Sequence, residues 1–396
     1  MSRSSPAILA RLVFTGVALA SGGIAFYVPL MLAAVGLAHS GTWAAGILFG
    51  TNLGRLVGSH FASRHGVFTQ RRGAIVANIL LEGVALFSMA FIQAPWGLVA
   101  VATLAGLGSG LSFPGMKSWL MRLPGLDSAR VFAGLSLALR LGMAIGYLAG
   151  ALVGAQHLTA VFSVLLLMFV GYAAFMDLAM RGIESTPAPP TPAASVATSS
   201  PAVDAPLPVD ITPLLLANAV FWFLVIQPGV TMSLMLPRFV PALPVSAPYW
   251  MSTVTVLLLQ MRVTRLARGQ AGHLSFLRVG IACMAVAFAL LALAGEHAAC
   301  VLAAAVLVAL SQVFYSPSLD VLIAGDARAR GLDLGKTMAR QLFWQNLGMM
   351  GGSLFAGVLF DEALRRAMPS LAWSVPALGA LAMLAAWTLG MRRARA

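Results

Sequence analysis

The chain has 396 residues, of which 60% are hydrophobic and only 9% are charged, whereas soluble domains carry about 25% charged residues. So little charge excludes an ordinary water-soluble protein, and the lipid bilayer must be the main solvent of the chain. The net charge of +13 does not indicate nucleic-acid binding, because the basic residues lie in short segments between apolar runs, as is typical of membrane proteins.

The apolar runs predict twelve membrane-spanning helices, since a helix of about 20 residues crosses the hydrocarbon core. A helix also satisfies its own backbone hydrogen bonds in lipid. The first run exceeds the core of a signal peptide and is expected to be a retained helix. The predicted spans are 10–34, 41–63, 74–93, 96–121, 129–154 and 157–180 in the first half, and 211–237, 248–266, 275–295, 298–323, 337–360 and 370–391 in the second.

Residues 182–210 interrupt the apolar pattern with a segment rich in Pro, Ala, Ser and Val. Its composition predicts a polar linker between two domains. The sequence therefore predicts an all-α polytopic membrane protein, with a six-helix bundle at 1–181, a linker at 182–210 and a six-helix bundle at 211–396.

Charge alternates between successive loops and predicts the orientation of the chain. Basic residues gather at both termini and in every second loop, whereas the loops at 35–40, 92–95 and 155–156 contain no Lys or Arg. Because positive loops remain in the cytoplasm, both termini and the linker are expected there, and the localisation is expected to be a bacterial cytoplasmic (inner) membrane. The loop residues that carry this argument are Arg64, Arg71, Arg72, Arg122, Arg130, Arg265, Arg268, Arg278, Arg328, Arg330 and Lys336.

The two halves contain similar motifs in the same order, which favours an internal duplication over chance similarity between glycine-rich helices. The stretch 113–117 corresponds to 316–320, and Leu-Gly-Met at 141–143 corresponds to Leu-Gly-Met at 347–349. Small residues at four-residue spacing share one helix face and permit close helix contact. They predict helix-packing positions at Gly142, Gly146, Gly150, Gly348 and Gly352.

Two six-helix repeats in the same orientation, joined by a cytoplasmic linker, resemble the major facilitator superfamily, whose halves rock around a central cavity. The loop motif of that family, Gly-x-Leu-Ala-Asp-Arg-x-Gly-Arg-Arg, is partly retained. Arg64 and Gly66 match it, whereas Ser59 and Ser63 replace its first glycine and its acidic residue.

Further positions are similar to the proton-linked exporters of this superfamily. Arg55 matches an arginine often found in helix two, and the glycine ladder from Gly142 to Gly154 resembles that of antiporters, with Tyr147 where proline is typical. Ala102 replaces an arginine to which the family assigns proton coupling. The resemblance implies export of a small organic molecule in exchange for protons.

Charged residues inside the bilayer cost free energy and are typical of functional sites, so the mechanism is predicted to depend on them. Arg55 and Glu82 are expected to pair, either as a structural ion pair or as a proton-linked pair that opens during transport. Lys117 and Asp320 occupy matching repeat positions and predict a gating contact across the halves. The alternatives for this second pair are snorkelling to the headgroups and capping of each residue's own helix.

Arg140 lies near the middle of its predicted helix and is expected to bind an acidic or carbonyl-bearing substrate, or else to pair with an acidic residue such as Asp320. Uncharged polar residues at Gln227, Gln345 and Asn346 are predicted to line the substrate site. Asp177, near the end of its helix, is expected to be structural.

These features predict a secondary transporter that exports a drug-like compound or a secreted metabolite such as a siderophore. Its expected partners are the small-molecule substrate, protons and the lipid bilayer. The sequence contains no phosphate-binding Walker motif, no catalytic constellation and no metal-ligand spacing, so an enzyme, a cofactor and a metal are not expected. The alternatives are a membrane-embedded enzyme and a solute importer of the same fold.

Overall fold

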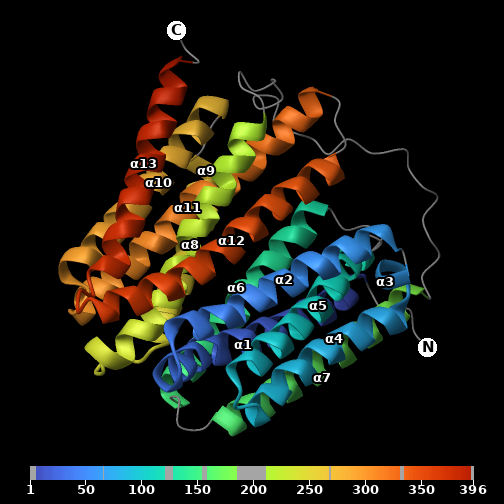
Figure 1. Cartoon of the computed structure of the whole chain (residues 1–396). Coiled ribbons are helices and arrows are strands. Elements are labelled where there is room, and N and C mark those ends of the chain that lie inside the picture. The colour runs from blue at the N-terminus through green and yellow to red at the C-terminus, as the bar shows by residue number, and fades with distance from the viewer. Residues whose placement is uncertain are drawn as a thin grey trace. The chain divides into compact units, whose positions relative to one another are not determined.

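A computed structural model describes residues 6–65, 67–120, 128–153, 158–184, 211–266, 269–330 and 334–393, and this part of the chain forms helices without strands (Figure 1). The helices follow from long apolar stretches whose backbone polar groups bond within the helix. The first half contains α1 (Pro6–Ala38), α2 (Gly41–Arg64), α3 (Val67–Gln70), α4 (Arg72–Ser88), the 3-10 helix η1 (Met89–Phe91), α5 (Pro95–Leu120), α6 (Ser128–Val153) and α7 (Leu158–Glu184).

The second half contains a similar series of long helices. They are α8 (Ile211–Phe239), α9 (Ala247–Leu266), α10 (Gly269–Ala294), α11 (Ala298–Ala329), α12 (Leu334–Arg365) and α13 (Leu371–Arg393). Each of the twelve predicted ranges overlaps one long helix of the described chain, whereas the crossing of a membrane by all twelve stays a prediction. The predicted linker at 182–210 lies almost wholly outside the described residues.

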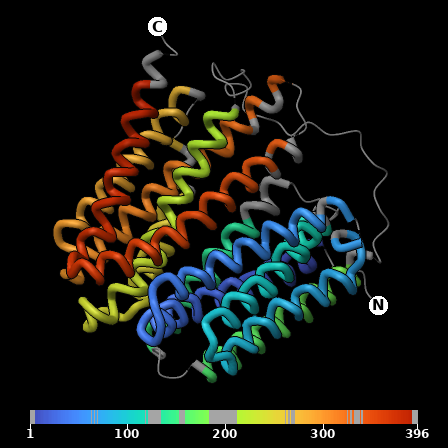
Figure 2. The backbone as a smooth tube through the Cα atoms, viewed as in Figure 1, coloured from blue at the N-terminus to red at the C-terminus, as the bar shows by residue number. Residues whose placement is uncertain are grey.

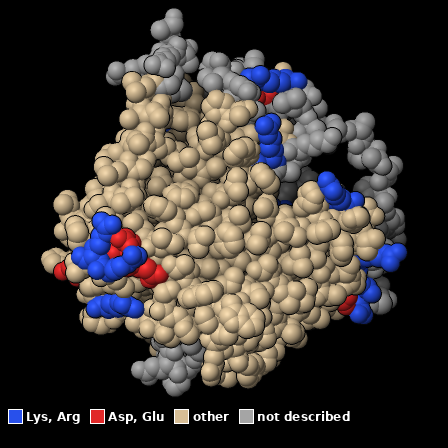
Figure 3. Space-filling view, viewed as in Figure 1, with Lys and Arg blue, Asp and Glu red and all other residues tan. Residues whose placement is uncertain are grey.

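Ten helices of the described chain are long and apolar enough to cross a membrane, as expected for a multi-pass membrane protein. The helices α2 and α9, which the sequence also predicts as spans, are not among these ten. Both contain polar residues within their apolar stretches, such as Asn52 and Arg55 in α2 and Gln260 in α9. On the face drawn in Figure 3, charged side chains gather in a few small groups and leave broad areas uncharged.

The described helices group into two compact units. The first contains α1, α2 from Gly46 onward and the helices from α3 to α7. The second contains the helices from α8 to α13 together with Ser40–Ala45, which comprise Ser40 and the first turn of α2. Within the first unit, α4 packs along both α5 and α7, as the backbone trace shows (Figure 2).

In the first unit, α1 packs between α6 and α7 and is one of the two most buried spans. A Cβ atom on Gly142 would overlap the backbone of Ala18, and one on Gly146 would overlap the backbone of Gly22. The two glycines of α6 therefore allow its backbone to touch that of α1. Gly150 is also buried, whereas Gly154 of the predicted ladder lies outside the described residues.

The second unit repeats this arrangement between α12 and α8, the other most buried span. A Cβ atom on Gly348 would overlap the backbone of Ala219, and one on Gly352 would overlap the backbone of Phe223. In each unit, two glycines four residues apart therefore bring the fifth long helix against the first long helix.

Candidate functional site

The first unit contains a buried polar cluster formed by side chains from five helices. Glu82 of α4 is only 5% exposed and interacts electrostatically with Arg55 of α2. The Ser109 hydroxyl of α5 lies close to the Glu82 carboxylate and can donate a hydrogen bond to it. Two buried phenols, Tyr27 of α1 and Tyr172 of α7, lie within the electrostatic reach of Glu82. Arg55 and Glu82 therefore lie within electrostatic reach of each other, and their direct pairing stays a prediction.

The local sequence of α5 explains how the cluster is assembled. A Cβ atom on Gly108 would lie 3.0 Å from the backbone nitrogen of Glu82, and one on Gly110 would lie 2.9 Å from the Cα atom of Arg55. These two glycines let α4 and α2 approach opposite sides of α5, and Ser109 between them supplies the hydroxyl. Sequence reasoning missed this Gly-Ser-Gly segment, although small residues on either side of a polar residue are a signal of close helix approach.

A second group of glycines allows the backbones of α2 and α5 to pack closely beside the cluster. A Cβ atom on Gly54 would overlap the Thr103 carbonyl oxygen, and one on Gly106 would overlap the Thr51 carbonyl oxygen. The backbones therefore touch from both sides, and this contact sets the depth and rotation at which Arg55 enters the cluster.

The chemistry of this cluster suits a site that gains and loses a proton. A buried carboxylate is costly unless a cation and hydrogen-bond donors stabilise it, and Arg55 and Ser109 are the nearby groups that can do so. The Nε atom of Arg55 is buried and forms no hydrogen bond within the described chain. An arginine with an unused N–H donor can exchange one hydrogen-bond partner for another while its side chain stays inside the protein.

Arg140, the predicted substrate ligand, lies on α6, half-buried, and its guanidinium interacts electrostatically with the buried Tyr147 two turns further along the helix. Tyr147 occupies the position at which the resemblance to antiporters leads one to expect proline. Its phenol can orient the guanidinium.

Lys117 and Asp320 have defined surroundings within their own units. The Lys117 ammonium lies 4.6 Å from the centre of the Phe113 ring, one turn earlier on α5. Asp320 of α11 accepts a 2.6 Å hydrogen bond from the Gln341 side chain of α12. The predicted gating contact between Lys117 and Asp320 stays a prediction.

The Asp320–Gln341 pair belongs to a polar contact that the sequence analysis did not identify. Gln341 is buried, and its main-chain carbonyl oxygen accepts a 3.3 Å hydrogen bond from the side chain of Asn218 on α8. The helices α8, α11 and α12 are therefore linked by polar side chains as well as by packing. The sequence offered one signal of this contact, namely a polar Asn and a polar Gln inside predicted membrane spans.

The predicted substrate-lining residues of the second unit lie on α8 and α12. Gln227 is buried and donates a 3.2 Å hydrogen bond to the Phe223 carbonyl oxygen, while its own side-chain oxygen forms no hydrogen bond within the described chain. Gln345 and Asn346 are half-buried on α12. These amides offer both donors and acceptors to a polar ligand.

Two other features lie apart from these residues. Asp177 of α7 forms ion pairs with Arg72 of α4, at 3.2 Å, and with Arg181, at 2.6 Å, so it links two helices of the first unit.

In the second unit, a small cavity of about 120 Å³ is lined by residues that include Met235, Leu291, Glu296, His297, Ser370 and Trp373. The predicted substrate ligands do not line it.

The sequence matches no family model and no curated protein. The fold, in contrast, is shared with solved transporter structures over almost the whole chain. The POT family transporter PepTSo superposes with a TM-score of 0.74 at 13% identity, covering 98% of each chain. The nucleoside transporter NupG superposes with a TM-score of 0.69 at 14% identity, covering 98% of this chain and 99% of the other.

A POT family transporter in complex with 5-aminolevulinic acid also superposes, with a TM-score of 0.70 at 14% identity, covering 98% of this chain and 96% of the other. At such low identities the likeness establishes the fold alone. The chain thus shares its polytopic helical fold with these solved structures.

Proposed function

We propose that the chain is a secondary active transporter that moves a small organic molecule across a membrane by alternating access, coupled to protons at Glu82 and Arg55. The observation that carries the proposal is the buried Arg55–Glu82–Ser109 cluster inside a transporter fold. A carboxylate that is buried this deeply is retained at a cost in stability, which is typical of functional sites within membranes.

The proposed substrate ligands are Arg140, Gln227, Gln345 and Asn346. A half-buried guanidinium matches carboxylate or carbonyl groups, and amide side chains supply further hydrogen bonds. The proposed substrate is therefore a small molecule with acidic or carbonyl groups. In this proposal both termini lie in the cytoplasm and the chain resides in a bacterial inner membrane, because the loop charges follow the positive-inside rule.

Export in exchange for protons is the first candidate direction. It is supported by the glycine positions of α6, Gly142 and Gly146, which lie against α1 and resemble the ladder of antiporters. Import is the second candidate. It is supported by the likeness in fold to peptide and nucleoside transporters, one of them in complex with 5-aminolevulinic acid.

Proton flux in liposomes tests the proposal and separates the two directions. The purified chain is reconstituted with a pH-sensitive dye inside, and 5-aminolevulinic acid, dialanine and uridine are added outside as probes. Proton entry together with a transported probe supports import by symport, whereas proton exit during probe entry supports antiport. A transported probe that moves at the same rate with and without a pH gradient would show that proton coupling is wrong.

Replacement of Arg140 by Lys is expected to weaken the affinity for an acidic probe by about 10-fold or more, because an ammonium cannot form the bidentate contact of a guanidinium. The measurement is the Michaelis constant for uptake of 5-aminolevulinic acid, with maximal velocity determined separately. The matched control is Arg72→Lys, which alters an arginine of α4 that pairs with Asp177. An unchanged Michaelis constant in Arg140→Lys would assign Arg140 a structural role.

A further inference from the structure

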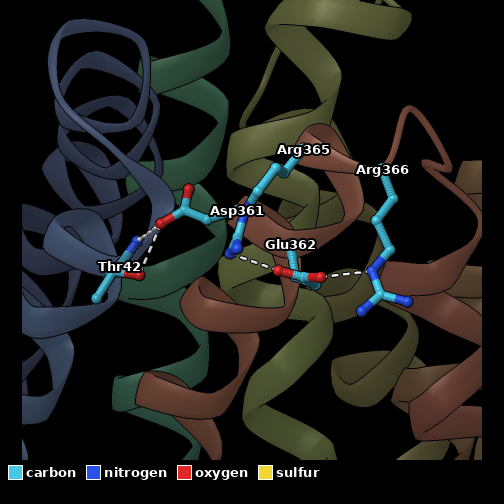
Figure 4. Close-up of polar contacts among 5 residues, drawn as sticks. All are labelled: Thr42, Asp361, Glu362, Arg365 and Arg366. Atoms are coloured by element: carbon cyan, nitrogen blue, oxygen red, sulfur yellow. Dashed lines mark hydrogen bonds and ion pairs between the residues drawn. The ribbon is translucent and has the colours of Figure 1, made fainter.

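The first turn of α2 is held by a carboxylate from a helix more than 300 residues away in the chain (Figure 4). One oxygen of Asp361, near the end of α12, accepts a 2.7 Å hydrogen bond from the Gly41 amide. The other oxygen accepts hydrogen bonds from the Thr42 amide, at 2.9 Å, and from the Thr42 hydroxyl, at 2.6 Å. Both carboxylate oxygens are therefore used to bind α2.

The physical basis of this contact is the positive end of a helix. The first amide groups of a helix have no acceptor within the helix, and the aligned peptide dipoles favour a negative charge there. α2 already has a local cap, since the Ser40 hydroxyl accepts a 3.2 Å hydrogen bond from the Trp43 amide. Asp361 binds the two amides that precede Trp43, so it is not needed to start the helix and acts as a connection between α2 and α12.

Close backbone packing surrounds the connection. A Cβ atom on Gly41 would lie 3.0 Å from the Gly357 carbonyl oxygen, and one on Gly357 would overlap the Gly41 carbonyl oxygen. The two glycines thus permit the approach that places Asp361 within hydrogen-bonding distance. The neighbouring Phe360 is fully buried, and the Arg238 guanidinium lies 5.7 Å from the centre of its ring.

The connection acts on a helix whose two ends belong to different groups of helices. Ser40 and the first turn of α2 cluster with α8–α13, whereas the helix from Gly46 onward clusters with α1 and α3–α7. A movement that carries the whole of α2 with the first unit must therefore break the hydrogen bonds to Asp361.

We propose that Asp361 is a conformational catch, which holds the first turn of α2 in one state of the transport cycle and releases it in another. This inference rests on the proposed transport function. The catch stabilises the conformation in which it is closed, and its strength sets the fraction of molecules in that conformation.

The adjacent residue provides a matched control. Glu362 is also a carboxylate, but it pairs with Arg365 and Arg366 of its own helix and of the turn that follows (Figure 4). Replacing Glu362 by Gln removes a neighbouring charge without removing a bond to α2.

Cysteine labelling of the full chain in nanodiscs tests the catch. Ser replaces Cys283 and Cys300, and Ala44→Cys introduces a reporter at a position of α2 that is fully buried. In this background, Asp361→Ala is expected to increase the labelling rate of a water-soluble maleimide about 10-fold or more, the factor that loss of one charge-assisted hydrogen bond produces. Thr42→Val, which removes one of the three bonds, is expected to cause a smaller increase, and Glu362→Gln none.

Equal labelling rates in Asp361→Ala and the background would overturn the catch, as would an equal increase in Glu362→Gln. Hydrogen–deuterium exchange at Gly41 and Thr42 supplies a second measurement that does not depend on the reporter, and unchanged exchange in Asp361→Asn and Asp361→Ala would also overturn it. Neither measurement requires transport. Failure of proton-coupled uptake in the unmodified chain would therefore contradict the proposed function separately.

Discussion

Replacement of Glu82 by Gln is expected to reduce gradient-driven accumulation of the substrate strongly while leaving exchange of substrate across the membrane intact. Gln is close to Glu in size, so it fills the space beside Gly108 and can still accept from Ser109, but it cannot release a proton. Coupling between two ligands of one protein typically changes the affinity for each by about 5–150-fold. The accumulation of substrate by the variant is expected to be lower than that of the unmodified chain by about this factor. Transport against a gradient and counterflow are measured side by side in liposomes.

Asp177→Asn is the matched control for this variant. Asp177 is also a carboxylate paired with arginine in the first unit, but its partners are Arg72 and Arg181 rather than Arg55. Accumulation is expected to persist in this control. If Glu82→Gln accumulates substrate as the unmodified chain does, the Arg55–Glu82 pair is structural and the proton must bind elsewhere.

Gly106→Ala is expected to be among the most destabilising single substitutions of the first unit. The added carbon would overlap the Thr51 carbonyl oxygen, which is backbone and cannot rotate away, so α2 and α5 must separate. Overpacking of this kind typically lowers the free energy of unfolding by about 1–3 kcal/mol. Because Arg55 follows Thr51 by one turn, the same separation is expected to reduce transport as well.

Gly73→Ala provides the comparison, since no atom lies within 4 Å of a Cβ placed on Gly73. In this helical position the substitution is expected to be neutral or to stabilise by up to about 1 kcal/mol. Thermal unfolding in detergent compares the two variants. Equal unfolding temperatures would mean that α2 and α5 do not pack as tightly as the glycines indicate.

The helices were predictable because a bilayer requires long apolar helices, and the predicted range 41–63 differs from α2 by a single residue. Deviations occur where a helix continues beyond its apolar stretch. α11 extends to Ala329, whereas apolar composition alone ends the predicted span at 323. The short helix α3 has too few residues to produce a hydropathy signal.

The candidate site was predictable only in part, for a reason specific to membrane helices. A helix that faces lipid is apolar on its outer side as well as its inner side, so hydropathy does not reveal which way a residue such as Ser109 points. Arg55 and Glu82 were recognisable because charge is rare in the bilayer. Gln341, Asn218 and Asp361 were missed, because their partners lie on helices whose rotation the sequence does not determine.

The burial of α1 against α6 also has a consequence for biosynthesis. α1 ends at Ala38, and its glycine-containing partner is complete only when the ribosome reaches Val153, 115 residues later. At about 5–20 residues per second, the first helix must wait in the membrane for roughly 6–23 s. α8 waits similarly for α12. Both early helices are apolar enough to remain in lipid, but their contact surfaces are exposed during this interval, so membrane insertion factors have a defined period in which to protect them.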